Sequence, residues 1–169
     1  MVARNTNLSE YSFELIFRFD QEIDDDVVMH SLARAECTDA LVGLGINRHI
    51  SLAFNRSAKN AKSAISMAIK QVKKALPQAT LVEVKPDYVG LTDAAHWLGM
   101  SRQNMRKIMI HHADQFPSAV HHGSTPIWHL FHITQFMKMR RQAAHSSVHE
   151  LAQAAMQINV RRSVEDAQF

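Results

Sequence analysis

Apolar and polar residues alternate along three segments in the first half of the chain, and a fourth segment is extended without such an alternation. An alternation with a period of two places one set of side chains on each face of a β-strand. The predicted strands are residues 12–19, 40–46, 49–55 and 80–85. In the first of them the apolar face is Phe13, Leu15, Phe17 and Phe19. A hairpin at residues 47–48 joins the second strand to the third.

One stretch of the first half instead repeats apolar residues every three or four positions, as a helix with one buried face does. It predicts a helix that Ser57 caps and Pro77 ends. Its buried stripe is Ala61, Ala64, Ile65, Ala68, Ile69, Val72 and Leu76. A second helix is predicted over residues 26–35, because the acidic run before it suits the positive end of the helix dipole.

The predicted order up to residue 85 is strand, helix, strand, strand, helix, strand. This is the order of the ferredoxin-like split βαβ fold, an antiparallel sheet with two helices on one face. An RNA-recognition module of this shape needs aromatic residues on the open face of the sheet. Here Phe13, Phe17 and Phe54 lie on the faces that must cover the helices, which disfavours RNA stacking. Two roles remain for this domain, dimerisation through its sheet or edge strands, which we prefer, and binding of a small effector.

Residues 91–112 predict two short helices joined by a tight turn. Thr92 caps the first helix, whose apolar side is Ala94, Ala95 and Leu98, and Gly99 ends it. Ser101 caps the second helix, which turns Met105, Ile108 and Met109 toward the first. Two short helices in this arrangement form a helix-turn-helix, and the N-terminal residues of the second helix would meet the base edges of DNA.

Further along the chain we predict a wing and a supporting helix. Residues 118–121 and 127–129 are expected to pair as two strands around the turn residues Gly123, Ser124, Thr125 and Pro126. A helix from about Phe131 then places Ile133, Phe136 and Met137 at helical spacing, which suits packing beneath the second helix of the helix-turn-helix. Pro86–Asp87 is the expected hinge between this region and the first domain.

Residues 88–139 resemble the winged helix-turn-helix DNA-binding domains of the MerR and excisionase type. The resemblance rests on four motifs: Gly90-Leu91-Thr92, Leu98-Gly99-Met100-Ser101-Arg102-Gln103, Phe116-Pro117 and Trp128. It implies a compact DNA-binding domain whose partner is double-stranded DNA.

The opening turn of the second helix has side chains suited to base recognition. Arg can bond guanine through two donors, and Gln and Asn can do the same for adenine, so Arg102, Gln103 and Asn104 suit a major groove. Arg106 and Lys107, one turn later, suit phosphates, and the wing histidines suit the phosphate backbone. The complete set of expected DNA contacts is Thr92, Ser101, Arg102, Gln103, Asn104, Arg106, Lys107, His121, His122 and Ser124.

A last helix is predicted near the C-terminus. Ser147 and Glu150 form a capping box, and the apolar stripe is Val148, Leu151, Ala152, Ala155 and Ile158. So narrow a stripe must pack on its own domain or on the same helix of a second subunit. A symmetric dimer would read an inverted repeat with half-sites about 10 base pairs apart, or a multiple of that. Residues 161–169 are expected to fray.

Charge is unevenly distributed along the chain. Lys and Arg balance Asp and Glu up to residue 87, so the net charge of +3 is carried by residues 88–169. An excess of positive charge on the segment with the helix-turn-helix is what binding to phosphate requires. The single cysteine, Cys37, rules out an internal disulfide and fits a reducing compartment. Because neither a signal peptide nor an apolar span of about 20 residues occurs, we expect a cytoplasmic protein without a membrane partner.

Catalytic and metal-binding patterns are weak. The sequence lacks a Gly-rich phosphate loop and a nucleophile elbow, so we expect neither an enzyme nor a cofactor. The acidic run at residues 20–26 lacks the Gly and terminal Glu of a calcium loop, and the doublets His111-His112 and His121-His122 lack a nearby cysteine. We expect no metal site.

These inferences predict an α+β protein that acts as a dimeric, sequence-specific transcriptional regulator. A ferredoxin-like domain covers residues 1–86, a winged helix-turn-helix domain covers residues 87–145, and a helix and tail cover residues 146–169. The alternative is a protein-interaction or effector-sensing module, antitoxin-like, whose DNA binding is autoregulatory.

Overall fold

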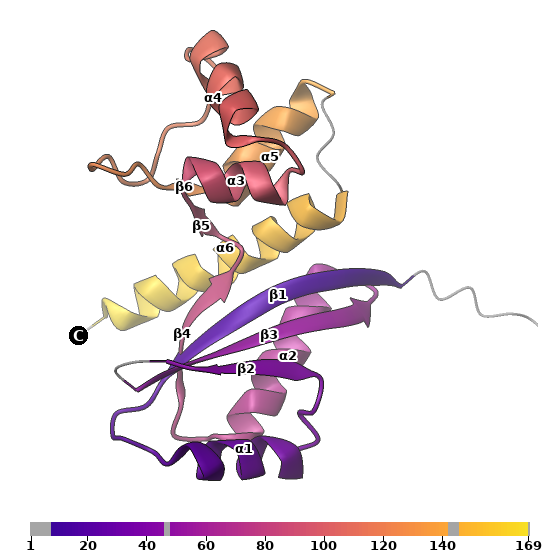
Figure 1. The fold of residues 1–169 in the computed structure, drawn as a ribbon, viewed down its shortest axis with the longest axis vertical. Coiled ribbons are helices and arrows are strands. Elements are labelled where there is room, and N and C mark those ends of the chain that lie inside the picture. The colour runs from indigo at the N-terminus through magenta and orange to yellow at the C-terminus, as the bar shows by residue number, and fades with distance from the viewer. Residues whose placement is uncertain (1–7, 46–47, 142–145, 169) are drawn as a thin grey trace, which may run out of the picture. The chain divides into compact units, whose positions relative to one another are not determined.

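The computed structural model describes residues 8–45, 48–141 and 146–168 and has a mixed α+β architecture (Figure 1). By their internal contacts the residues form two units, Met1–Lys85 and Pro86–Phe169. The elements of the first unit are β1 (Ser9–Arg18), α1 (Asp25–Arg34), β2 (Ala40–Leu44), β3 (His49–Ala58), α2 (Ala61–Ala75) and β4 (Thr80–Lys85). Those of the second are β5 (Tyr88–Val89), α3 (Leu91–Trp97), α4 (Arg102–His111), β6 (Trp128–His129), α5 (Leu130–Met139) and α6 (Ser146–Asp166).

Strand β1 lies inside a four-stranded antiparallel sheet with the strand order β2-β3-β1-β4. Its pairing with β3 sets Phe13 opposite Phe54, and the two rings stack with centroids 5.4 Å apart. Both are buried, together with Tyr11, Leu15, Phe17 and Phe19. The predicted apolar face of the first strand is confirmed, and its rings are not open to stacking by RNA bases. The hairpin predicted at residues 47–48 lies partly outside the described residues.

Helix α2 packs against β1 and β3 through the stripe that its periodicity predicts (Figure 1). Its buried residues are Ala61, Ala64, Ile65, Ala68 and Val72. The predicted cap at Ser57 is wrong, because Ser57 still belongs to β3, where it pairs with Glu10 of β1. Asn60 caps the helix instead, and its side-chain oxygen accepts from the Ser63 amide at 2.8 Å. Pairing with the long β1 strand thus keeps Ser57 extended, and the helix begins later.

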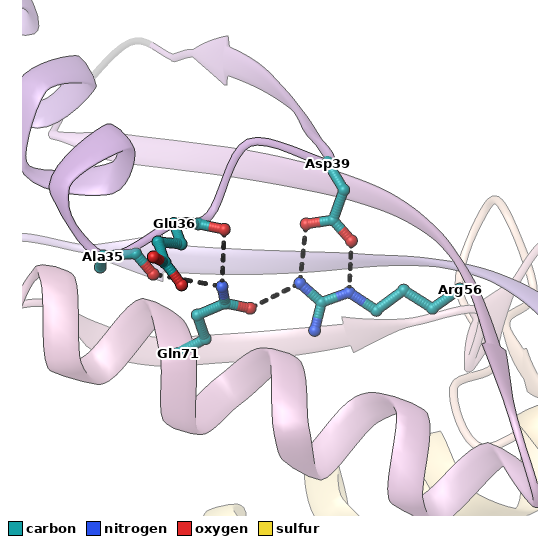
Figure 2. Close-up of polar contacts among 5 residues, drawn as sticks. All are labelled: Ala35, Glu36, Asp39, Arg56 and Gln71. Carbon is teal, nitrogen blue, oxygen red and sulfur yellow. Dashed lines mark hydrogen bonds and ion pairs between the residues drawn. The ribbon is translucent and has the colours of Figure 1, made fainter.

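A polar cluster ties the connection between α1 and β2 to the rest of the first unit (Figure 2). The guanidinium of Arg56 donates twice to the Asp39 carboxylate, at 2.6 and 2.8 Å, and once to the Gln71 side chain at 2.7 Å. The Gln71 amide then donates to the backbone oxygens of Glu36 at 2.9 Å and Ala35 at 3.2 Å. Three elements are joined because Arg56 belongs to β3, Gln71 to α2, and the other three residues to the α1–β2 connection.

The described residues of the second unit form a hydrophobic core that includes most of the residues predicted for α3, α4 and α5, although Ile108 and Met109 are only partly buried against it. Its buried members are Val89, Ala94, Ala95, Leu98, Met105, Trp128, Leu130, Ile133, Phe136, Met137 and Ala152. Helix α6 packs on α5. At this contact Ala152 enters the core, and Nδ1 of His149 lies 2.9 Å from the Thr134 hydroxyl. The N-terminal half of α6 therefore packs within its own unit.

The predicted pairing of the wing is found only between His121 and Ile127, whereas the next two residues pair with another strand. Residues 128–129 form β6, which pairs with β5, setting Val89 opposite Trp128. Within the described residues, segment 118–121 contributes only an isolated bridge between His121 and Ile127. Pairing with β5 lets the Trp128 ring enter the core, where it is 7% exposed, and lets its Nε1 donate to the Pro117 backbone oxygen at 3.0 Å.

Asp87 is not the loose hinge that the Pro-Asp pair suggests, because it is fully buried. One oxygen of its carboxylate lies 2.6 Å from Nδ1 of His129, and the other accepts from the Asn159 amide at 2.8 Å. The Asp87 backbone oxygen accepts from the Leu130 amide at 2.7 Å. Asp87 thus joins β6, α5 and α6, and it belongs to the framework of the second unit.

Helix α6 differs from its prediction at both ends. Ser147 lies inside the helix instead of capping it, and residues 142–145 fall outside the described part. The predicted fraying from residue 161 is wrong up to Asp166, because opposite charges one turn apart stabilise that turn: Arg161 pairs with Glu165 at 3.0 Å and Arg162 pairs with Asp166. Among the described helices, none combines the length and apolar character needed to cross a lipid bilayer.

Candidate nucleic-acid interface

Helix α3 begins one residue before the predicted cap. Gly90 occupies the N-cap position with an extended backbone and no side-chain hydrogen bond, and Leu91 is already helical. Thr92 therefore lies in the first turn, so the predicted capping role of Thr92 is wrong. The buried side of the helix is confirmed by Ala94 and Ala95.

Gly99 ends α3 at the turn into α4, as the sequence predicts, and its backbone there is left-handed. Gly99 has a φ of +64°, a conformation that costs a residue with a Cβ more than it costs glycine. The Gly99 amide donates to the His96 oxygen at 3.0 Å, and the Met100 amide donates to the Ala95 oxygen at 3.0 Å. These two bonds form a Schellman motif, which ends α3 and redirects the chain into α4.

Ser101 caps α4 as predicted. Its hydroxyl oxygen accepts from the Asn104 amide at 3.1 Å, so it satisfies one of the unpaired donors of the first turn. Met105 is fully buried below this turn, whereas Arg102, Gln103 and Asn104 are exposed above it. The cap thus fixes the direction in which the exposed side chains leave the helix.

Three stripes of α4 differ in their surroundings. Gln103, Lys107 and Ile110 follow one another at the spacing of a single helix face and are all exposed, with Ile110 at 58%. On one side of this outward stripe, Arg102, Arg106 and Met109 line a concave surface. On the other side lies Asn104, whose amide nitrogen is 4.0 Å from the Met100 sulfur.

The concave surface has a volume of about 450 Å³ and lies between α4, the start of α3 and residues 124–126. It brings together four of the predicted contact residues: Thr92, Arg102, Arg106 and Ser124. Sequence reasoning missed Asp93 and Thr125, which also line it. Their only signal was position, next to Thr92 and Ser124 respectively.

His121 and His122 are exposed but do not line the concave surface. The His121 ring lies over Gly123, where an added Cβ would come within 2.5 Å of Nε2. A side chain at residue 123 would therefore require this exposed ring to move aside. His129, the other histidine near the predicted wing, is bonded to Asp87. In the part of the chain that the structure describes, no group of three or more His, Cys, Asp or Glu residues could hold a metal ion.

The cations of α4 have no acidic partner in the described part of the chain. No carboxylate there forms a salt bridge with Arg102, Arg106 or Lys107. Three unpaired positive charges on two turns of one helix favour an anionic partner. Comparison of the chain with protein families, with characterised proteins and with solved structures finds no match.

Proposed function

We propose that this chain is a sequence-specific DNA-binding transcriptional regulator whose α4 enters the major groove. The observation that carries the proposal is the capped opening of α4, where Arg102, Gln103 and Asn104 are all exposed while Met105 anchors the helix in the core. Residues that meet base edges must protrude in this way at the start of the second helix of a helix-turn-helix. The unpaired cations of α4 support attraction to phosphate.

The proposal includes a fold for each unit. The order of elements and the strand order β2-β3-β1-β4 support a ferredoxin-like first unit. For the second unit, α3, the glycine turn, α4 and the bridge between His121 and Ile127 support a winged helix-turn-helix like that of the MerR and excisionase type. A regulator of this kind works where the DNA is, which fits the cytoplasmic location expected from the sequence.

We extend the proposal to a homodimer that reads an inverted repeat. In the described residues, exposed apolar side chains are available for self-association on β2, through Leu41, and on α6, through Val160 and Val164. Sedimentation velocity measures this directly. A chain that stays monomeric both free and on its DNA site would contradict this part of the proposal.

A fluorescence anisotropy titration tests DNA binding. The probes are a labelled duplex from the region upstream of the chain's own coding sequence and a shuffled duplex of the same composition, each at several salt concentrations. We expect tighter binding to the upstream duplex and a loss of affinity as salt rises, since counterions are released from the phosphates. Equal affinity for both duplexes, or none for either, would contradict the proposal.

Gln103→Ala separates base recognition from general attraction. Removal of an amide that pairs with adenine is expected to cost about 1–3 kcal/mol on the upstream duplex and little on the shuffled one. The matched control is Gln135→Ala on α5, which removes the same exposed group from another helix of this unit. We expect this control to leave both affinities unchanged.

A further inference from the structure

The concave surface beside α4 contains two guanidiniums without a partner. Arg102 and Arg106 lie one turn apart, so they extend from the same side of the helix. Three hydroxyl residues from other segments, Thr92 of α3 and Ser124 and Thr125 of the turn before β6, also line the concave surface. The one acidic residue at the surface, Asp93, forms no salt bridge with either arginine in the described part of the chain.

This composition suits a compact anion with several acceptor oxygens. A guanidinium presents parallel N–H donors that match the oxygens of a phosphate. Each Ser or Thr hydroxyl can donate one further hydrogen bond to these oxygens. A guanine edge in the major groove also offers acceptors to a guanidinium, but it is reached by a side chain that protrudes from the helix. Arg102 and Arg106 instead line a hollow, about 100° around the helix from the outward stripe of Gln103 and Lys107.

We propose that this concave surface binds a single phosphate group, held by Arg102 and Arg106 with the hydroxyls of Thr92, Ser124 and Thr125. In the complex with DNA, which rests on the proposed function, the phosphate is one of the duplex backbone. Arg102 is then a phosphate contact rather than the guanine reader that its sequence position suggests. The base edges are left to the other exposed side chains of α4, where Gln103 and Asn104 suit adenine and Ile110 suits the methyl group of thymine.

Asp93 gives the proposal a second, opposite consequence. Asp93 lines the same concave surface and its negative charge repels an incoming phosphate, so removal of this charge strengthens binding at this site. A base-reading Arg102 does not predict such an effect on shuffled DNA. The pair of opposite changes, removal of a cation and removal of an anion at one surface, distinguishes a phosphate site from a loss of folding.

The test measures the affinity of Arg102→Ala, Arg106→Ala and Asp93→Asn for the upstream and the shuffled duplex across a salt series. We expect each arginine variant to lose about the same factor, roughly 5- to 50-fold, on both duplexes and to reduce the salt slope by about 1. Asp93→Asn is expected to gain a few-fold on both. Lys62→Ala, an exposed cation of α2, is the control for charge alone and is expected to leave both affinities unchanged. A loss confined to the upstream duplex in Arg102→Ala would overturn the assignment.

A second arm separates the phosphate site from the proposed function. The Nε–H signals of Arg102 and Arg106 are followed by NMR in the full chain as inorganic phosphate, or the duplex, is added. Shifts with the duplex alone support a backbone phosphate, and shifts with inorganic phosphate in a chain that binds no DNA support a free-phosphate site while the regulator role fails. If neither probe moves these signals, the phosphate site is overturned.

Discussion

The contact between Arg56 and Asp39 shows how one side chain can hold a connection in place. Figure 2 shows the guanidinium of Arg56 between Asp39 and Gln71, and it donates hydrogen bonds to both side chains. The hydrogen bonds and the charge of Arg56 lower the pKa of the Asp39 carboxyl below its usual value, although burial opposes them. Burial, and then the charge of Asp39, raises the pKa of the neighbouring Cys37 thiol, which favours its neutral form.

The lowered pKa of Asp39 predicts how stability depends on acid. Because the folded state binds this proton less readily than the unfolded state, the stabilisation is full above the usual pKa of 3.8 and is lost as the pH falls through the lowered value. Asp39→Asn is expected to lower the free energy of unfolding at pH 7 by about 1 kcal/mol, a modest figure because the carboxylate is 45% exposed. Urea denaturation at pH 7 and pH 3 checks this.

The control for Asp39 is Asp20→Asn, which removes an exposed partner of Arg18. The side chains of Arg18 and Asp20 are 48% and 78% exposed. Asp20→Asn is therefore expected to change the free energy of unfolding by less than about 0.5 kcal/mol at either pH. Equal effects of the two variants at pH 7 would show that the Arg56 contact is no stronger than a surface pair.

Local patterns predict which residues are buried, but not which polar residues meet across the chain. Phe13 and Met105 follow from periodicity alone, because a strand or a helix repeats its buried positions. The bond from Asn159 to Asp87 joins residues that are 72 positions apart, and neither has a local signal that names the other. The proline at residue 86 suggested that Asp87 is a hinge. Its hydrogen bonds to His129 and Asn159 instead make it a buried residue of the second unit.

Replacement of Asp87 tests this reassignment. Asp87→Ala leaves the His129 ring and the Asn159 amide without their buried acceptor, so we expect a loss of about 3–5 kcal/mol in the free energy of unfolding. Asp114→Ala, an exposed carboxylate on the same unit, is the matched control and is expected to be nearly neutral. A nearly neutral Asp87→Ala would contradict a structural role for the buried network.

At the scale of whole elements, the helices were more predictable than the strand pairings. The Gly99 turn and the Ser101 cap were readable because their signals lie within five residues of the bonds they make. The end of β3 and the partner of β6 were not readable, because each depends on a strand distant in the sequence. The candidate site follows the same rule: the exposed start of α4 was predicted, but the hollow shared with residues 124–126 was not.

The two caps predicted for α3 and α4 make a matched test. Ser101→Ala removes the hydrogen bond from the Asn104 amide and is expected to lower the free energy of unfolding by about 1 kcal/mol. Thr92→Ala removes a hydroxyl from inside the first turn of α3, where it caps nothing, so we expect a change below about 0.5 kcal/mol. Thermal or urea unfolding measures both. A larger loss for Thr92→Ala than for Ser101→Ala would reverse the two assignments.

At the scale of the whole molecule, the two units are expected to respond to acid in different ranges. The first unit depends on the ionised Asp39, whose protonation requires a pH below 3.8. The second contains His149, whose ring lies 5.1 Å from that of Phe131 and whose Nδ1 is bonded to the Thr134 hydroxyl. Because that hydroxyl donates to the Phe131 oxygen, His149 donates to Thr134. Burial, and then the charge of Lys138, lowers the pKa of His149 from its usual 6.5.

A lowered histidine pKa means that the folded second unit resists a proton that the unfolded chain accepts. Its stability is therefore full above about pH 6.5 and falls as the pH drops toward the lowered value, by less than about 1 kcal/mol because the ring is partly exposed. Both tryptophans, Trp97 and Trp128, lie in this unit, so their fluorescence reports its unfolding alone. We expect urea midpoints from tryptophan fluorescence to fall between pH 7.5 and 5.5 in the native chain and to change less in His149→Gln. The control is His30→Gln in the first unit, whose urea midpoint should change with pH as in the native chain. If both variants reduced the change of the midpoint with pH equally, the titrating group would be a residue other than His149.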